Sequence, residues 1–381
     1  MKDSARVVVI GGGITGCSIL YHLAKAGWKD LVMVEKNEIT SGATCMAMGL
    51  LTQFNSSPTM MRFRKYSSEM YTDLGVFEKV GSLRIASSKT QHLTLLKEVS
   101  QAKGVGLDVD IISPKEALKI MPWMSSENVY SAVYLPQDGH LDPHGATHAV
   151  AKAARDLGAI IYTDTKVTGI DLTPDGAIAG VRTNKGDIRC EIVVNCAGLW
   201  AAQVAAMVGA KIPSTPVVHQ HAGLGAVPGS EVPEGAPCFR DTEYLIYGRP
   251  EHGGVLLGGW EINPVSTWED GVPWSHAATE LPTEFDRFEP LFENAVKRFP
   301  FLAEAGLERL IAHPAAFTPD SRGEPVLCGD EHGKQPADAA WPDRVHGHEP
   351  RQSDQHDHGH PGHGIEYRPV DIAAHEPLVV D

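Results

Sequence analysis

The chain has 381 residues, of which 42% are hydrophobic, and a formal net charge of −15. This length and apolar content allow two connected domains with a substantial core. The acidic balance disfavours nonspecific binding to nucleic acid or to an anionic membrane, since both need Lys and Arg as counter-charge. No apolar run approaches the roughly 20 residues that span a bilayer. A strand pattern starts by residue 7, which leaves no room for a leader peptide. We therefore expect a cytoplasmic protein, or else a mitochondrial matrix protein whose transit peptide has been removed.

The start of the chain predicts a strand, a glycine-rich turn, a helix and a second strand. Residues 7–10 are continuously hydrophobic, as in a strand covered on both faces. Residues 14–26 carry apolar side chains at helical spacing, and Gly27 ends this pattern. Residues 31–35 supply the second parallel strand of a βαβ unit.

The glycines of the turn favour a bound dinucleotide. Gly11 turns where a side chain would clash, Gly13 lets the backbone approach a pyrophosphate, and Gly16 lets the helix pack close to the strand. The phosphates would then meet unpaired N–H groups at the helix N-terminus. Glu35 would accept hydrogen bonds from ribose hydroxyls, and its charge disfavours the 2′-phosphate of NADP. FAD and NAD remain.

The rest of the chain alternates helical and strand patterns. Helices are predicted at residues 58–77, 90–103, 114–120, 144–157 and 283–299. Strands are predicted at 81–86, 159–162, 166–171 and 192–198, the last of them buried, with hairpins through 175–176 and 185–186. Residues 215–261 predict an antiparallel sheet in which 244–247 and 255–260 form the clearest pair, and 306–317 closes the body.

Two further features bear on the chemistry. Small residues gather in segment 40–51, which would let the backbone lie against a flat ring system. The six cysteines are widely spaced and form no CxxC pair, which favours reduced thiols and no metal site.

Several blocks, in fixed order, resemble one protein family. They are residues 11–16 with Glu35 and Lys36, and the segments 40–50, 166–170, 194–200 and 317–320. Over residues 5–329 the chain resembles the FAD-dependent oxidoreductase domain of the dimethylglycine and sarcosine dehydrogenases, in the D-amino acid oxidase superfamily. The resemblance implies an α/β fold, with a Rossmann-like FAD-binding domain interleaved with an antiparallel-sheet substrate domain.

This resemblance also implies a division of the chain. The FAD-binding domain would comprise residues 1–80, 145–210 and 305–329, and the substrate domain residues 81–144 and 211–304. Residues 330–381 hold eight of the 18 histidines and have no apolar period, which predicts a disordered tail.

FAD is the implied cofactor, with contacts along three segments. By resemblance, Ile14 and Thr15 face the pyrophosphate, residues 42–50 run along the isoalloxazine edge, and the Val167 backbone touches the adenine. The implied cofactor contacts are Gly11, Gly13, Ile14, Thr15, Gly16, Glu35, Lys36, Gly42, Ala43, Thr44, Cys45, Met46, Ala47, Gly49, Leu50, Val167, Ala197, Gly198 and Trp200.

The sequence departs from the family at two places. Many relatives have Trp-His where this chain has Cys45 and Met46, and that His carries the flavin covalently. Since Met46 cannot form this link, we expect non-covalent FAD. Relatives also continue beyond the segment 317–320 with a strand, a glycine-rich turn over the flavin and a helix, whereas this pattern stops here at about residue 329.

The resemblance implies oxidation of an N-methylated amino acid, such as sarcosine or dimethylglycine, by hydride transfer to the flavin. A substrate carboxylate calls for a cation or hydroxyl on the sheet that faces the flavin. Tyr247 and Arg249 share one face of the predicted strand, and His219 is a candidate for proton exchange. We expect His219, Tyr247 and Arg249 to act on the substrate.

Other readings remain open. A glycine or D-amino acid oxidase would keep the cofactor and change the substrate. A non-catalytic homologue, like the regulatory subunit of the pyruvate dehydrogenase phosphatase, would fit the change at Met46 and the unusual tail. The expected partners are a small-molecule amine and an electron acceptor, either oxygen or an electron-transfer flavoprotein, with no nucleic acid and no membrane.

Overall fold

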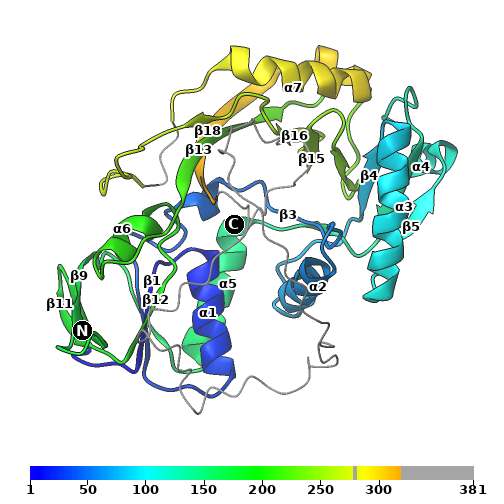
Figure 1. The fold of residues 1–381 in the computed structure, drawn as a ribbon. Coiled ribbons are helices and arrows are strands. Elements are labelled where there is room, and N and C mark those ends of the chain that lie inside the picture. Colours follow the sequence, from blue (N-terminus) through cyan, green and yellow to red (C-terminus); the bar gives the residue numbers. More distant parts are fainter. Residues whose placement is uncertain (278–280, 319–381) are drawn as a thin grey trace, which may run out of the picture.

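The computed structural model describes residues 1–277 and 281–318, which form a mixed α/β fold with several sheets (Figure 1). Its helices are α1 (Ile14–Lys25), α2 (Pro58–Asp73), α3 (Lys89–Gly104), α4 (Pro114–Ile120), α5 (Pro143–Asp156), α6 (Ala201–Ala206) and α7 (Phe285–Arg298), with short 3-10 turns η1 (Ala43–Met46), η2 (Gly198–Trp200) and η3 (Pro300–Glu304). The strands of the first half are β1 (Val7–Ile10), β2 (Leu31–Val34), β3 (Leu50–Leu51), β4 (Ser82–Ala86), β5 (Asp110–Ile112), β6 (Ser131–Leu135), β7 (Gly139–His140), β8 (Ile160–Tyr162) and β9 (Val167–Leu172). Those of the second half are β10 (Ile178–Thr183), β11 (Gly186–Arg189), β12 (Ile192–Asn195), β13 (Thr215–Leu224), β14 (Cys238–Asp241), β15 (Ile246–Glu251), β16 (Gly254–Gly259), β17 (Val265–Ser266) and β18 (Leu307–Phe317).

A four-stranded parallel sheet, in the order β12-β1-β2-β8, carries the first βαβ unit. Every residue of β1 and β2 is buried, because both faces of the sheet are covered. Helices α1 and α5 pack on one face, and the antiparallel sheet of β9, β10 and β11 packs on the other (Figure 1). The strand–turn–helix–strand prediction is confirmed.

Strand β12 differs from its prediction. Its apolar sequence suggests a buried strand, but all four of its residues are only half-buried. The reason is its place at the edge of the sheet, where β1 is the neighbour it pairs with. The edge lies beside the turn that follows β1, so β12 leads directly into the candidate site.

A nine-stranded sheet forms the second layer, with the path β17-β13-β16-β15-β14-β4-β6-β5 and β18 paired to β13. Helix α7 covers one face of it through Phe288 and Leu291, which join Phe239 and Leu257 in one core (Figure 1). At the other end of the sheet, α2 and α3 pack on β4 and β6. The antiparallel sheet predicted for residues 215–261 is confirmed as part of this larger sheet, in which β14 and β4 pair in parallel.

Two predicted boundaries need correction. The strand expected at 244–247 begins at Ile246, because Leu245 has a φ of 57° and belongs to a tight turn. The helix expected at 58–77 ends at Asp73, ahead of Gly75 with a φ of 70°. Strand β18 pairs along its length with β13 and so belongs to the nine-stranded sheet by its hydrogen bonds.

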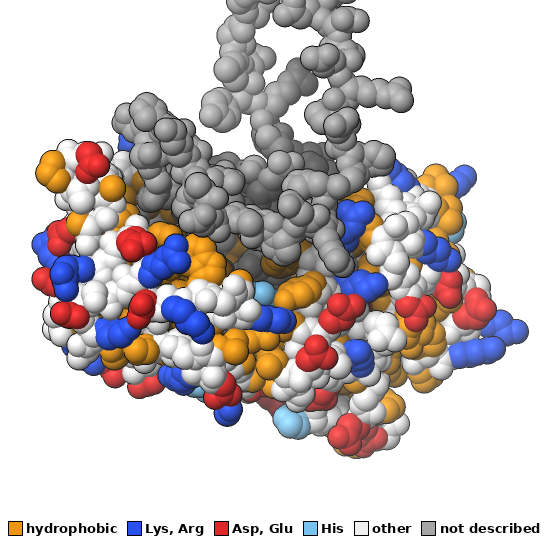
Figure 2. Space-filling model, turned by 90° about the horizontal axis from the view of Figure 1, so that it is seen from below, with side chains coloured by type: hydrophobic (Ala, Val, Ile, Leu, Met, Phe, Trp, Pro, Cys, Tyr) orange, Lys and Arg blue, Asp and Glu red, His pale blue; other side chains and the backbone are white. Residues whose placement is uncertain are grey.

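None of the helices within the described ranges combines the length and the apolar character needed to cross a membrane. On the face shown in Figure 2, acidic and basic side chains are interspersed. The predicted tail at 330–381 lies outside the described residues.

Candidate functional site

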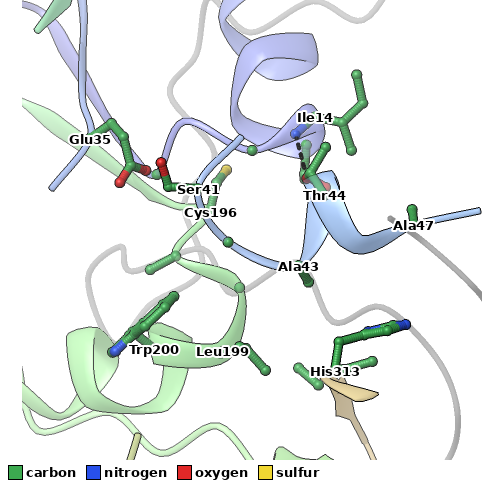
Figure 3. Close-up of a pocket in the computed structure, with 18 of the residues that line it drawn as sticks. Ile14, Glu35, Ser41, Ala43, Thr44, Ala47, Cys196, Leu199, Trp200 and His313 are labelled. Atoms are coloured by element: carbon green, nitrogen blue, oxygen red, sulfur yellow. Dashed lines mark hydrogen bonds between the residues drawn. The ribbon is translucent and has the colours of Figure 1, made fainter. Parts of the chain in front are cut away.

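One cavity lies between the parallel sheet and the nine-stranded sheet, and segments far apart in the chain line it (Figure 3). The parallel-sheet side contributes the turn after β1, the ends of β2 and β12, the loop 41–50 and residues 165–167. The nine-stranded sheet contributes His219, His221, Arg240, Tyr247 and His313. The cavity therefore joins a dinucleotide-type turn to a polar sheet face.

The glycine turn has the close backbone approaches that the sequence predicts. Gly11 has a φ of 113°, and a Cβ there would lie 2.2 Å from the carbonyl oxygen of Cys196. A Cβ on Gly16 would lie 1.9 Å from the carbonyl oxygen of Gly11. Gly11, Gly13, Ile14 and Thr15 line the cavity, whereas Gly16 packs behind it.

Not all backbone N–H groups in the first turn of α1 lack a hydrogen-bond partner. Gly13 is the N-cap and offers no side chain to the first turn. The Ile14 N–H donates to Thr44 Oγ1 at 3.2 Å, the bond that Figure 3 marks with a dashed line. The expectation of unpaired N–H groups at this end therefore needs correction at Ile14.

Glu35 lines the cavity with its carboxylate held in place. Its Oε2 accepts from the Gly12 N–H at 2.7 Å, and its Oε1 accepts from the Asn37 N–H at 2.9 Å. Each oxygen has a second lone pair, so the carboxylate retains acceptor capacity for a ribose hydroxyl.

Lys36 also lines the cavity, but its ammonium group is engaged. It lies 4.1 Å from the centre of the Trp200 ring and donates to the carbonyl oxygen of His276 at 2.6 Å. Burial lowers the pKa of Lys36. Lys36 thus links the end of β2 to the segment that contains Trp274 and His276, which the sequence analysis missed.

Most of the predicted small-residue loop lies against the cavity. Gly42, Ala43, Thr44, Ala47, Gly49 and Leu50 are lining residues. Cys45 and Met46 are not among them, although the resemblance implied that they contact the flavin. They lie in η1, where the Cys45 thiol donates to the carbonyl oxygen of Gly42 at 3.3 Å and burial raises its pKa.

The remaining implied cofactor residues, Val167, Ala197, Gly198 and Trp200, all line the cavity. A dinucleotide fits this donor set. The Gly11 turn brings backbone to the cavity, Glu35 offers a fixed carboxylate, and a Cβ added to Gly42 would meet only Trp200, at 3.9 Å. The small side chains therefore leave room for a flat ring.

On the sheet side, the structure brings His219 and Tyr247 to the cavity, but not Arg249. Arg249 Nε donates to the carbonyl oxygen of Met48 at 2.9 Å, and its guanidinium pairs with Glu251 at 2.9 Å. Arg240 lines the cavity instead. It lies opposite Tyr247 across β14 and β15, with its guanidinium carbon 5.4 Å from the centre of the Tyr247 ring.

Three histidines line the same face. Burial lowers the pKa of His221 to about 3 and the pKa of His313 to about 4, so both rings are neutral at pH 7. His219 has a carboxylate partner, Glu261. Sequence reasoning missed His313, whose signal was the alternation of residues 313, 315 and 317 along one strand. Within the described ranges, no group of three or more His, Cys, Asp or Glu side chains is placed to hold a metal ion.

Comparisons with known proteins agree with this geometry. Human mitochondrial sarcosine dehydrogenase is 33% identical over 334 residues, which cover 84% of this chain and 36% of that protein. The mitochondrial pyruvate dehydrogenase phosphatase regulatory subunit of Mus musculus is 32% identical over 343 residues, covering 86% of this chain and 39% of that protein. The chain thus spans less than two fifths of the length of either relative.

The fold has a close counterpart among solved structures. L-proline dehydrogenase from P. horikoshii superposes with a TM-score of 0.74 at 28% identity, covering 86% of this chain and 87% of that one. The family of FAD dependent oxidoreductases named DAO matches residues 6–369. The chain belongs to this DAO family of FAD-dependent oxidoreductases, with FAD as its cofactor.

Proposed function

We propose that this chain oxidises an N-methylated amino acid, such as sarcosine or dimethylglycine, with demethylation and with hydride transfer to FAD. The observation that carries the proposal is the shared cavity, in which the Gly11 turn and Glu35 face the same space as Arg240, Tyr247 and His219. Similarity to sarcosine dehydrogenase supports the substrate class. Since the chain spans 36% of that relative, the activity of the whole protein is part of the proposal.

Arg240, Tyr247 and Arg249 would have different roles in this reaction. FAD bound in the cavity supplies the two-electron acceptor for the hydride of the N-methyl carbon. The Arg240 guanidinium would bind the substrate carboxylate through charge-assisted hydrogen bonds, with the Tyr247 hydroxyl beside it. Arg249 acts indirectly in this scheme, because it holds the Met48 carbonyl and thereby the loop 41–50.

We further propose that FAD binds without a covalent link. Met46 lacks the imidazole that carries the flavin in many relatives, and neither Met46 nor Cys45 lines the cavity. The electron acceptor would be oxygen or an electron-transfer flavoprotein. The mitochondrial names of the two relatives favour a matrix location over a cytoplasmic one.

Anaerobic reduction of the FAD-loaded protein tests the proposal. Sarcosine or dimethylglycine should bleach the visible absorbance of the oxidised flavin faster than glycine or a D-amino acid does. Faster bleaching by the primary amines would identify a glycine or D-amino acid oxidase. Purified protein that is colourless and does not take up added FAD would overturn the proposal and favour a regulatory homologue.

A further inference from the structure

Among the three cavity histidines, His219 differs from His221 and His313 because it contacts a carboxylate, that of Glu261. Glu261 Oε2 lies 2.9 Å from His219 Nδ1, and the Glu261 side chain is 2% exposed. His221 Nδ1 and His313 Nδ1, by contrast, are buried with no hydrogen-bond partner in the described part of the chain. Glu261 therefore equips one imidazole of the three to carry a proton.

Glu261 has little freedom to leave this contact. Its second oxygen, Oε1, accepts from the backbone N–H of Gln220 at 2.8 Å. The two bonds come from consecutive residues of β13, so they fix both the position and the rotation of the carboxylate. The same restraint extends to the imidazole ring bonded to it.

The tautomer of His219 follows from this contact. An ionised carboxylate only accepts hydrogen bonds, so the neutral His219 ring must carry its hydrogen on Nδ1. Its Nε2 then has the lone pair, and this atom is buried without a partner among the described residues. The rings of Trp260 and Phe317 pack against the imidazole, with 5.0 Å and 5.2 Å between ring centres. A buried nitrogen lone pair without a partner favours a ligand that donates a hydrogen bond to it.

We propose that Glu261 is a positioning residue that fixes His219 as the proton acceptor for the ammonium group of the substrate. This inference rests on the proposed function. In the step, the substrate N–H bond breaks and a bond between the proton and His219 Nε2 forms, while the substrate nitrogen keeps the electron pair that supports oxidation of its methyl group. The positive charge moves to the imidazole, where the Glu261 carboxylate at 2.9 Å stabilises it.

Glu261→Gln tests the tautomer directly. If the amide oxygen takes over the Gln220 N–H, the amide NH₂ faces His219 Nδ1 and donates to it, so the hydrogen of the ring moves to Nε2. We would record ¹⁵N spectra of histidine-labelled, FAD-loaded protein without substrate and assign His219 from its absence in His219→Gln. The expected result is an unprotonated Nε2 in the wild type and a protonated Nε2 in Glu261→Gln.

Kinetics supply the second readout. The limiting rate of flavin reduction by sarcosine should fall about 10²- to 10⁴-fold in Glu261→Gln, the usual contribution of general base catalysis. The dissociation constant of sarcosine should change less than about threefold, because binding and proton transfer are separate steps. Glu261→Asp, which retains a carboxylate, should recover part of the rate.

Glu78→Gln is the matched control. Glu78 lies 3.9 Å from His140 Nε2, but its side chain is 72% exposed. Neither the tautomer of His219 nor the reduction rate should change in this variant. A wild-type His219 protonated at Nε2 would overturn the inference even if Glu261→Gln folds poorly, because this measurement needs only the wild type. An unaltered rate in folded Glu261→Gln would overturn it as well. Failure of every N-methylated amine to reduce the wild-type flavin would instead overturn the proposed function, while the spectra still report on the contact with Glu261.

Discussion

The two ends of the cavity are built from different kinds of sequence signal. At the dinucleotide end, the turn, α1 and Glu35 come from the first 35 residues and touch one another directly. At the substrate end, Arg240 and Tyr247 face each other in the hairpin of β14 and β15, and His313 on β18 joins them only through the strand order of the nine-stranded sheet. A local motif therefore fixes one end of the cavity, and long-range strand order fixes the other.

Gly11→Ala should have the largest effect, because it breaks the local motif. The added Cβ would lie 2.2 Å from the carbonyl oxygen of Cys196, at a φ of 113°. The backbone strain costs about 1–3 kcal/mol, and the clash moves the turn away from β12. We expect a lower melting temperature and a loss of FAD binding, measured by thermal denaturation and by titration with FAD.

Gly27→Ala is the control for Gly11→Ala. Gly27 ends the same helix with a φ of 88°, but nothing lies within 4 Å of the position that its Cβ would take. The expected cost is about 1–2 kcal/mol of stability from the left-handed backbone alone, with FAD binding retained. Equal loss of FAD binding in both variants would contradict a specific role for the Gly11 turn.

The contrast also explains what the sequence revealed and what it hid. Residues 114–120 were predicted as a helix and form α4 with these bounds, because Ser113 and Glu116 make a local capping box. The bound side chain of Arg249 was hidden, because its partner Met48 lies about 200 residues earlier in the chain. His313 was missed for the same reason, since β18 pairs with β13 across about 90 residues.

Arg240→Gln should have the next largest effect, and it tests whether Arg240 binds the substrate carboxylate at the substrate end. Loss of a hydrogen bond to a charged group costs about 1.5–3 kcal/mol, so the dissociation constant of sarcosine should rise about 10- to 100-fold. Arg249→Gln, whose guanidinium is bound to Met48 and Glu251, should not alter the preference for a carboxylate.

The measurement compares sarcosine with an N-methylated amine that lacks the carboxylate. In the wild type, sarcosine should reduce the flavin at much lower concentration. Arg240→Gln should remove this preference, while Arg249→Gln should retain it. A preference that survives in Arg240→Gln and disappears in Arg249→Gln would restore Arg249 as the residue that binds the carboxylate.

The buried histidines make the substrate end the pH-sensitive part of the cavity. Burial lowers the pKa of His221 to about 3, with further contributions from His313, Arg309 and Arg249. Burial, together with His219, lowers the pKa of His313 to about 4. Each lies below the ordinary value of 6.5. As the pH falls below 6.5, the unfolded chain binds protons that the folded chain does not, so stability is present above this pH and is lost on acidification.

The expected loss is about 2 kcal/mol per histidine between pH 6.5 and about pH 5. Urea denaturation at several pH values would measure it, and His313→Gln should flatten the dependence relative to the wild type. His252→Asn, at an exposed turn position, is the control. A wild-type stability that rises on acidification in this range would contradict the burial of neutral histidines.

Cys45→Ser should have the smallest effect. It tests whether Cys45 or Met46 takes part in binding FAD, as the resemblance to the family implied. Non-covalent FAD predicts that acid denaturation releases all of the flavin and leaves a polypeptide with the mass of the sequence. The serine variant should behave identically, because the Cys45 thiol donates to the Gly42 carbonyl and does not line the cavity. Flavin that stays with the wild-type chain but leaves Cys45→Ser would show a thioether at Cys45. The loop would then reorient when FAD binds, and a local motif would no longer suffice to describe the dinucleotide end.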